Sequence, residues 1–121
     1  MKKIALAVGL AATLFATAAD AMTVHEFLTT ASRIPRNPTA LLRSDTRRLM
    51  NEVKGAFRTV GQEQAAARAA GRAPATCMPE RVSVNPDQLL ARFNAIPAGR
   101  RQISVTDAIR EWMVERHPCR S

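Results

Sequence analysis

The two cysteines of the chain, Cys77 and Cys119, are the feature that most constrains its fold. They bracket the C-terminal third, which holds two short amphipathic helical patterns. If the two thiols pair, the bond closes a loop of 43 residues, counted from 77 through 119. Closing a loop of that length restricts the unfolded chain by about 4 kcal/mol. A contribution of that size is comparable with the whole stability of a small domain.

The first 21 residues have the three parts of a secretory signal peptide. Lys2 and Lys3 give a positive start, residues 4–19 form an apolar, alanine-rich run, and residues 19–21 read A-D-A. The run is shorter than the roughly 20 residues that a transmembrane helix needs. No later segment is apolar enough to span, so we expect no stable membrane insertion after cleavage behind Ala21. The sequence therefore predicts a periplasmic protein, in a compartment where disulfides persist.

The mature chain, residues 22–121, has the length of a single domain. It carries 16 basic and 9 acidic residues, a net charge of +7. Nucleic acid is a common partner of such a charge, but a periplasmic location argues against it. Acidic protein surfaces, anionic lipid headgroups and other polyanions of the envelope are the partners that remain. The alternative is a basic surface that is simply solvated, because net charge bears on association and not on fold.

Apolar residues at helical spacing predict an all-α fold, a small bundle of four to five helices. A capping box at Thr23 opens the first helix, and the proline-rich segment 32–38 ends it. A short helical pattern at 40–42 precedes the longest helix, predicted over 46–70 with Ser44 or Asp45 as its cap.

The end of the longest helix has a different composition from its beginning. Residues 62–70 form helix readily but carry no large apolar side chain, so we expect them to project from the body or to lie against it loosely. Gly71 is a typical stop signal.

Two further helices are predicted inside the cysteine-bracketed third. The first begins at Pro86 behind an Asn85 cap, and the second begins at Ser104. We expect their apolar faces to share one core with the longest helix, built from Leu89, Leu90, Phe93, Ile109, Trp112, Met113, Leu49, Val53 and Phe57.

The chain lacks a convincing catalytic or metal-binding pattern. His25 has no histidine or cysteine at chelating spacing, and His117-x-Cys119 is a single close pair. Structural zinc sites usually need two such pairs, whereas Cys77 stands alone. No glycine-rich phosphate loop or nucleophile motif occurs. We therefore predict a protein that is not an enzyme and has no metal or cofactor.

The cysteine-bracketed third resembles the Rap/Tai family of small periplasmic all-α immunity proteins of type VI secretion. A cysteine and a nearby proline follow a long helix, then comes V-x-x-x-x-Q-L, and an amphipathic last helix ends in P-C. The matching residues are Cys77, Pro79, Val82 or Val84, Gln88, Leu89, Pro118 and Cys119. Together with the signal peptide, the resemblance predicts a Cys77–Cys119 disulfide.

The resemblance also implies a binding protein. Such proteins protect the producing cell by docking on a peptidoglycan amidase effector and occluding its active site, often as a homodimer. Two other interpretations stay open. One is an envelope-stress or chaperone-like helical protein, and the other is a binder of anionic lipid or lipopolysaccharide surfaces.

Two arginine-rich surfaces are candidates for contact with a partner. The turn 96–102 joins two capped helices and carries Arg100 and Arg101, whose guanidinium groups suit bidentate contacts with carboxylates. The competing surface is the basic face of the long helix, around Arg47, Arg48 and Lys54.

Overall fold

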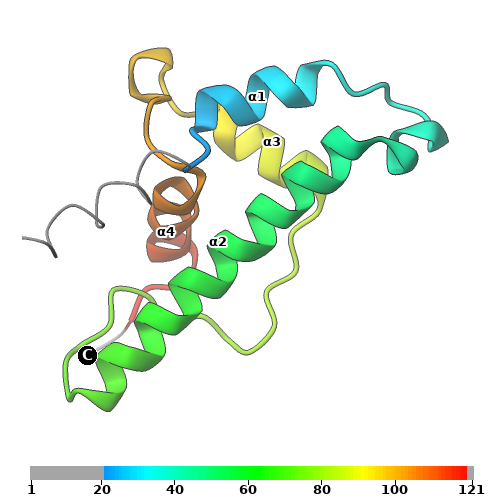
Figure 1. Ribbon diagram of the computed structural model, residues 1–121. Coiled ribbons are helices and arrows are strands. Elements are labelled where there is room, and N and C mark those ends of the chain that lie inside the picture. Colours follow the sequence, from blue (N-terminus) through cyan, green and yellow to red (C-terminus); the bar gives the residue numbers. More distant parts are fainter. Residues whose placement is uncertain (1–20, 120–121) are drawn as a thin grey trace, which may run out of the picture.

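The computed structural model describes residues 21–119, so the predicted signal peptide lies outside the described residues except for Ala21. In this range the chain forms helices and no strand (Figure 1). The elements are α1 (Val24–Ser32), η4 (Pro38–Leu42), α2 (Ser44–Ala69), α3 (Pro86–Asn94), η5 (Ala98–Arg100) and α4 (Val105–Arg116), where η denotes a 3₁₀-helix. Cys77 and Cys119 form a disulfide with their Cα atoms 4.9 Å apart. The predicted small all-α fold with one disulfide is confirmed.

Helix α2 is the long diagonal of the molecule, and α4 makes the most extensive contact with it (Figure 1). Its C-terminus has the predicted glycine stop: Gly71 has φ +72°, and the N–H of Arg72 donates to the carbonyl of Ala67 at 2.8 Å. This pattern satisfies carbonyls that have no partner within the helix. Among residues 21–119, no helix is both long enough and apolar enough to cross a membrane.

The N-terminus of α2 differs from the prediction. Ser44 is already the first helical residue, and Arg43 is the N-cap without a side-chain hydrogen bond. The short pattern before it forms the 3₁₀-helix η4, and Arg43, with extended backbone, is both the C-cap of η4 and the N-cap of α2. Asp45 instead lies in the first turn, where the helix dipole favours an anion.

The other predicted caps are present, although at Thr23 the described structure shows only the cap bond and not the full capping box. Thr23 Oγ1 accepts from the Glu26 N–H at 3.1 Å, and Ser104 Oγ accepts from the N–H of Asp107 at 3.0 Å. Asn85 forms a reciprocal capping box with Gln88. This bond gives Gln88, one of the residues that carry the family resemblance, a structural role at the start of α3.

The N-termini of α1 and α4 meet and satisfy part of each other's free backbone groups. The Val24 N–H donates to the Ile103 carbonyl at 2.9 Å, and the Val105 N–H donates to the Met22 carbonyl at 2.9 Å. An isolated antiparallel bridge joins Thr23 and Ser104 between them. The first residues of the described chain are thereby attached to the start of the last helix.

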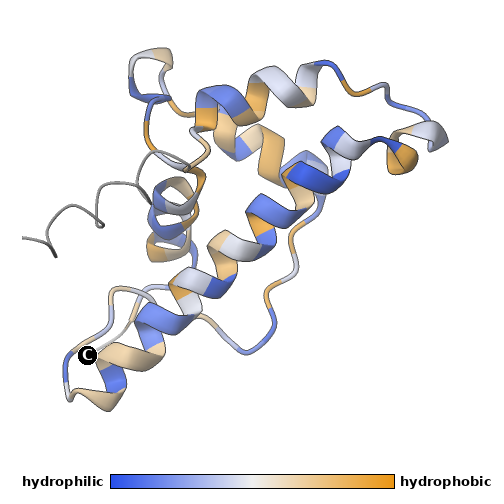
Figure 2. Ribbon diagram, in the orientation of Figure 1, coloured by the Kyte–Doolittle hydropathy of each residue, from blue (hydrophilic) through white to orange (hydrophobic). Residues whose placement is uncertain are grey.

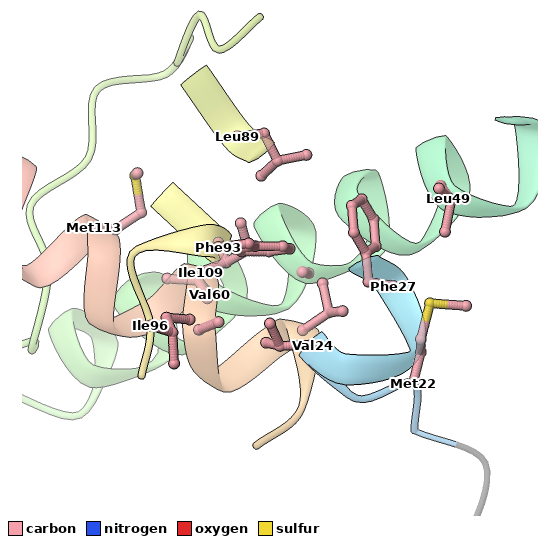
Figure 3. Packing of buried hydrophobic residues seen from close by; sticks show 13 residues of the cluster. Met22, Val24, Phe27, Leu49, Val60, Leu89, Phe93, Ile96, Ile109 and Met113 are labelled. Atoms are coloured by element: carbon pink, nitrogen blue, oxygen red, sulfur yellow. The ribbon is translucent and has the colours of Figure 1, made fainter. Parts of the chain in front are cut away.

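The core lies among the four α-helices: α1 and α4 pack on α2, and α3 packs on α1 (Figure 3). The largest fully buried side chains include Phe93, Ile109 and Met113, and the rings of Phe27 and Phe93 pack edge to face with centroids 5.1 Å apart. Leu49 and Leu89 are buried as predicted. The remaining four residues of the predicted core pack against it while only partly buried, namely Val53, Phe57, Leu90 and Trp112.

The C-terminal part of α2 does not lie loosely against the body, which corrects the prediction for residues 62–70. Ala67 is buried, and Gln64 holds the segment that leads to the disulfide. Its Oε1 accepts from the Met78 N–H at 2.7 Å and from the Thr76 hydroxyl at 2.9 Å, and its Nε2 donates to the Met78 carbonyl at 3.1 Å. The polar side chain of Gln64 thus holds this part of α2 against the segment 76–78, although the segment 62–70 has no large apolar side chain.

Candidate protein-docking site

The turn between α3 and α4 projects from the body beside α1 (Figure 1). Ile96 is buried and fixes one end in the core, whereas residues 97–100 are exposed. Backbone bonds close the turn on itself: the Arg100 N–H donates to the Pro97 carbonyl at 2.8 Å, and the Ile103 N–H donates to the Arg100 carbonyl at 3.3 Å. The result is a short protrusion with a defined backbone.

Arg101 stabilises this turn from within. Its Nε donates to the carbonyl of Ile96 and its Nη2 to the carbonyl of Asn94, each at 3.0 Å. Its own carbonyl accepts from the His25 N–H at 2.8 Å, which ties the turn to α1. Arg101, a predicted contact residue, therefore binds the backbone of its own chain.

Arg100 lies further out and pairs with α4. Its Nη2 donates to the two carboxylate oxygens of Glu111 at 2.9 and 3.2 Å, and about half of each side chain is exposed. Its remaining N–H groups are donors for a partner's carboxylate. Of the two adjacent arginines, Arg100 is thus the one suited to contact a partner.

Two more arginines on the α3–α4 side are neutralised by glutamates. Arg92 contacts Glu115 through both carboxylate oxygens at 2.5 and 3.0 Å, and this bond holds the pKa of Glu115 below its ordinary value. Arg110 bridges from α4 to Glu63 on α2 through two bonds of 2.8 Å, and it also contacts Asp107. Paired carboxylates therefore largely cancel the positive charge of this side.

The basic face of α2 lacks such neutralisation. Arg47, Arg48, Lys54 and Arg58 are exposed, and within residues 21–119 none of them forms an ion pair. The first three are the predicted contact surface, and Arg58 lies four residues after Lys54 on the same face. The structure thus separates a neutralised side at α3–α4 from an unneutralised basic face on α2.

An open groove of about 650 Å³ lies between α2 and the extended segment before α3. Phe57, Gly61 and Gln64 line it from α2, and Met78 and Val82 line the opposite wall. Its lining also includes the charged residues Arg68, Glu80 and Arg81.

Of the residues considered for metal binding, the cysteines are in the disulfide, whereas the buried Nε2 of His117 has no hydrogen-bond partner within residues 21–119. Cys119 is in the disulfide, and His117 is the C-cap residue of α4, whose N–H donates to the Met113 carbonyl at 2.8 Å. In the part of the chain that the structure describes, no three His, Cys, Asp or Glu side chains gather as a metal ion requires.

Comparisons of the chain with protein-family models, with curated proteins and with solved structures find no match. The site is accordingly defined by its own geometry, which is a preorganised turn bearing Arg100 and a separate basic face on α2.

The Arg110–Glu63 pair makes stability depend on pH. The hydrogen bonds from Arg110 lower the pKa of Glu63 from 4.5, against an opposing effect of burial. The stabilisation is therefore present above pH 4.5 and is lost as the pH falls through the lowered pKa. We expect Glu63→Gln to reduce the free energy of unfolding at pH 7 by about 0.5–1 kcal/mol, since the pair is half exposed.

This prediction is checked by urea unfolding of both proteins from pH 7 to acid. The difference between wild type and Glu63→Gln should shrink below pH 4.5. Glu80→Gln is the matched control, because Glu80 is exposed and has no ion-pair partner within residues 21–119. A difference for Glu63→Gln that stayed constant at all pH values would contradict the assignment.

Proposed function

We propose that the protein is a periplasmic, non-enzymatic inhibitor of the immunity type, which binds a peptidoglycan amidase effector and occludes its active site. The observation that carries this proposal is the preorganised turn between α3 and α4. A segment whose backbone is already fixed loses less conformational entropy on docking than a flexible loop. The turn is also narrow at its apex, where residues 97–99 are exposed and carry small or compact side chains.

The scaffold behind the turn supports the same proposal. The turn lies inside the disulfide-closed segment, between two capped helices and above the buried Ile96. This is also the part of the chain that carries the family resemblance. The bonds from Arg101 to backbone carbonyls account for the conformation of the turn. Arg100 supplies a charged contact at the base of the turn.

Gly99 offers a sharp test of this surface. A Cβ atom added at Gly99 meets nothing within 4 Å, and the residue does not have a positive φ, so Gly99→Trp should fold normally. The added indole would nevertheless block close approach to the apex. We expect binding to the proposed amidase effector to weaken at least 30-fold, which corresponds to the loss of about 2 kcal/mol at an interface centre.

Gly55→Trp is the matched control, because a Cβ at Gly55 on α2 also meets nothing within 4 Å. Binding is measured by calorimetric titration, occlusion by the rate of peptidoglycan cleavage, and folding by circular dichroism. Arg100→Ala and the double variant Arg47→Ala/Arg48→Ala then divide the charged contributions between the two surfaces. Normal inhibition by Gly99→Trp together with loss in Gly55→Trp would move the site to α2. A wild-type protein that does not bind the amidase would refute the proposed function.

A further inference from the structure

The charges of α2 are segregated around the helix. Arg47, Lys54 and Arg58 lie at i, i+7 and i+11, a spacing that places them on one side of an α-helix. All three are exposed and, within the described chain, unpaired. Glu63, in contrast, faces α4 and pairs with Arg110. The outward side of α2 therefore presents positive charge that no carboxylate of residues 21–119 neutralises.

An exposed apolar tip, formed by Leu41, Leu42 and Met50, adjoins this basic face. Leu41 and Leu42 of η4 are 72% and 80% exposed, and Met50 in the first part of α2 is 46% exposed. They are three of the four exposed large hydrophobic residues of the described chain, and the fourth, Val114, lies on α4. Figures 1 and 2 show η4 as an apolar tip at the far end of the molecule from the α3–α4 turn. Arg36 and Arg43 flank the tip in sequence.

We propose that η4 and the basic face of α2 together dock on the surface of an anionic phospholipid bilayer. Leu41 and Leu42 enter the boundary between headgroups and acyl chains, and Arg47, Lys54 and Arg58 contact headgroup phosphates. Apolar side chains beside a cluster of cations are the combination that holds peripheral proteins on anionic membranes. The chain is attached to the membrane surface and does not cross it.

The composition of the surface favours a lipid over a protein partner. The energetic centres of protein interfaces are enriched in Trp, Tyr and Arg, and leucine is under-represented there. The apolar tip of Leu41, Leu42 and Met50 holds leucine and methionine, and residues 36–56 contain no aromatic residue. A convex apolar tip also needs a partner that adapts its shape, and a fluid bilayer does so. Mobile anionic headgroups can in turn approach cations that have no fixed hydrogen-bond geometry.

This activity is independent of the inhibitor role. The α3–α4 turn and η4 lie at opposite ends of α1 (Figure 1), so one molecule can use both surfaces at once. Membrane attachment would keep an amidase inhibitor near the envelope surface where it meets an incoming effector. The test below contains no effector, so its outcome does not depend on the proposed function.

The test is sedimentation of the mature protein with vesicles of phosphatidylglycerol and phosphatidylcholine, compared with vesicles of phosphatidylcholine alone. We expect wild type to bind the anionic vesicles at least tenfold more tightly, with an affinity that falls as salt is added. Leu41→Ser/Leu42→Ser should weaken binding at least tenfold. Arg47→Gln/Lys54→Gln should do the same.

Two controls make the result specific to this surface. Arg72→Gln/Arg81→Gln removes the same charge from exposed positions elsewhere, and Val114→Ser removes the exposed apolar residue of α4. Both should bind within a factor of two of wild type. Equal loss in Arg72→Gln/Arg81→Gln would show attraction by net charge alone, and full binding by the leucine variant would exclude insertion. Either result, or a wild type without preference for anionic vesicles, overturns the proposal. Thermal melting of each variant confirms that it is folded.

Discussion

Replacing Cys77 with serine is expected to lower the free energy of unfolding by about 4 kcal/mol, because the bond to Cys119 closes a 43-residue loop in the unfolded chain. The measurement is equilibrium unfolding in guanidinium chloride, followed by the fluorescence of Trp112, the only tryptophan. For a domain of this size, such a loss is a large part of the total stability. The variant should therefore be partly unfolded at 37 °C.

Two controls separate the covalent bond from local packing. Cys119→Ser and the double variant should lose as much as Cys77→Ser and no more, since each removes the same bond. Gln64 and the bond from the Cys77 N–H to the His117 carbonyl stay in place in these variants. If Cys77→Ser lost less than about 1 kcal/mol, the bond would contribute far less than its loop length implies.

Phe93→Ala is expected to cost about 3–5 kcal/mol. Phe93 is fully buried and packs edge to face on Phe27, so truncation loses both the buried area and the aromatic contact. Chemical denaturation provides the measurement, and Phe57→Ala is the matched control. Phe57 is only partly buried, at the edge of the core, so its truncation should cost less. Equal losses for the two phenylalanines would show that the core is not centred on Phe93.

Much of the local structure was predictable because its signals lie within a few residues of one another. The caps at Asn85 and Ser104 and the stop at Gly71 each depend on bonds that span three to five residues. The apolar spacing likewise identified the buried faces of α3 and α4. The 3₁₀ form of η4 was missed, because a run of three apolar residues does not distinguish a 3₁₀ turn from an α-helix.

Contacts between distant residues were not predictable in the same way. Gln64 anchors Met78, 14 residues away, through a side chain that the apolar pattern ignores. Arg110 pairs with Glu63, which lies 47 residues earlier in the sequence. Arg100 and Arg101 are equivalent in sequence, yet Arg101 turns onto its own backbone and Arg100 toward Glu111. The sequence places the basic face on the long helix, but which cations remain unneutralised is a property of the fold.

The bond from the Val105 N–H to the Met22 carbonyl makes the start of α4 depend on a residue directly after the predicted signal peptide. If a signal peptidase cuts after Ala21, Met22 becomes the first residue and keeps both its carbonyl bond and its buried side chain. A cut two residues further on would remove Met22 together with Thr23, the cap of α1. The start of α4 would then lose its backbone acceptor, and the edge of the core would open. If the predicted signal peptide is removed, the position of the cut would therefore affect the stability of the fold.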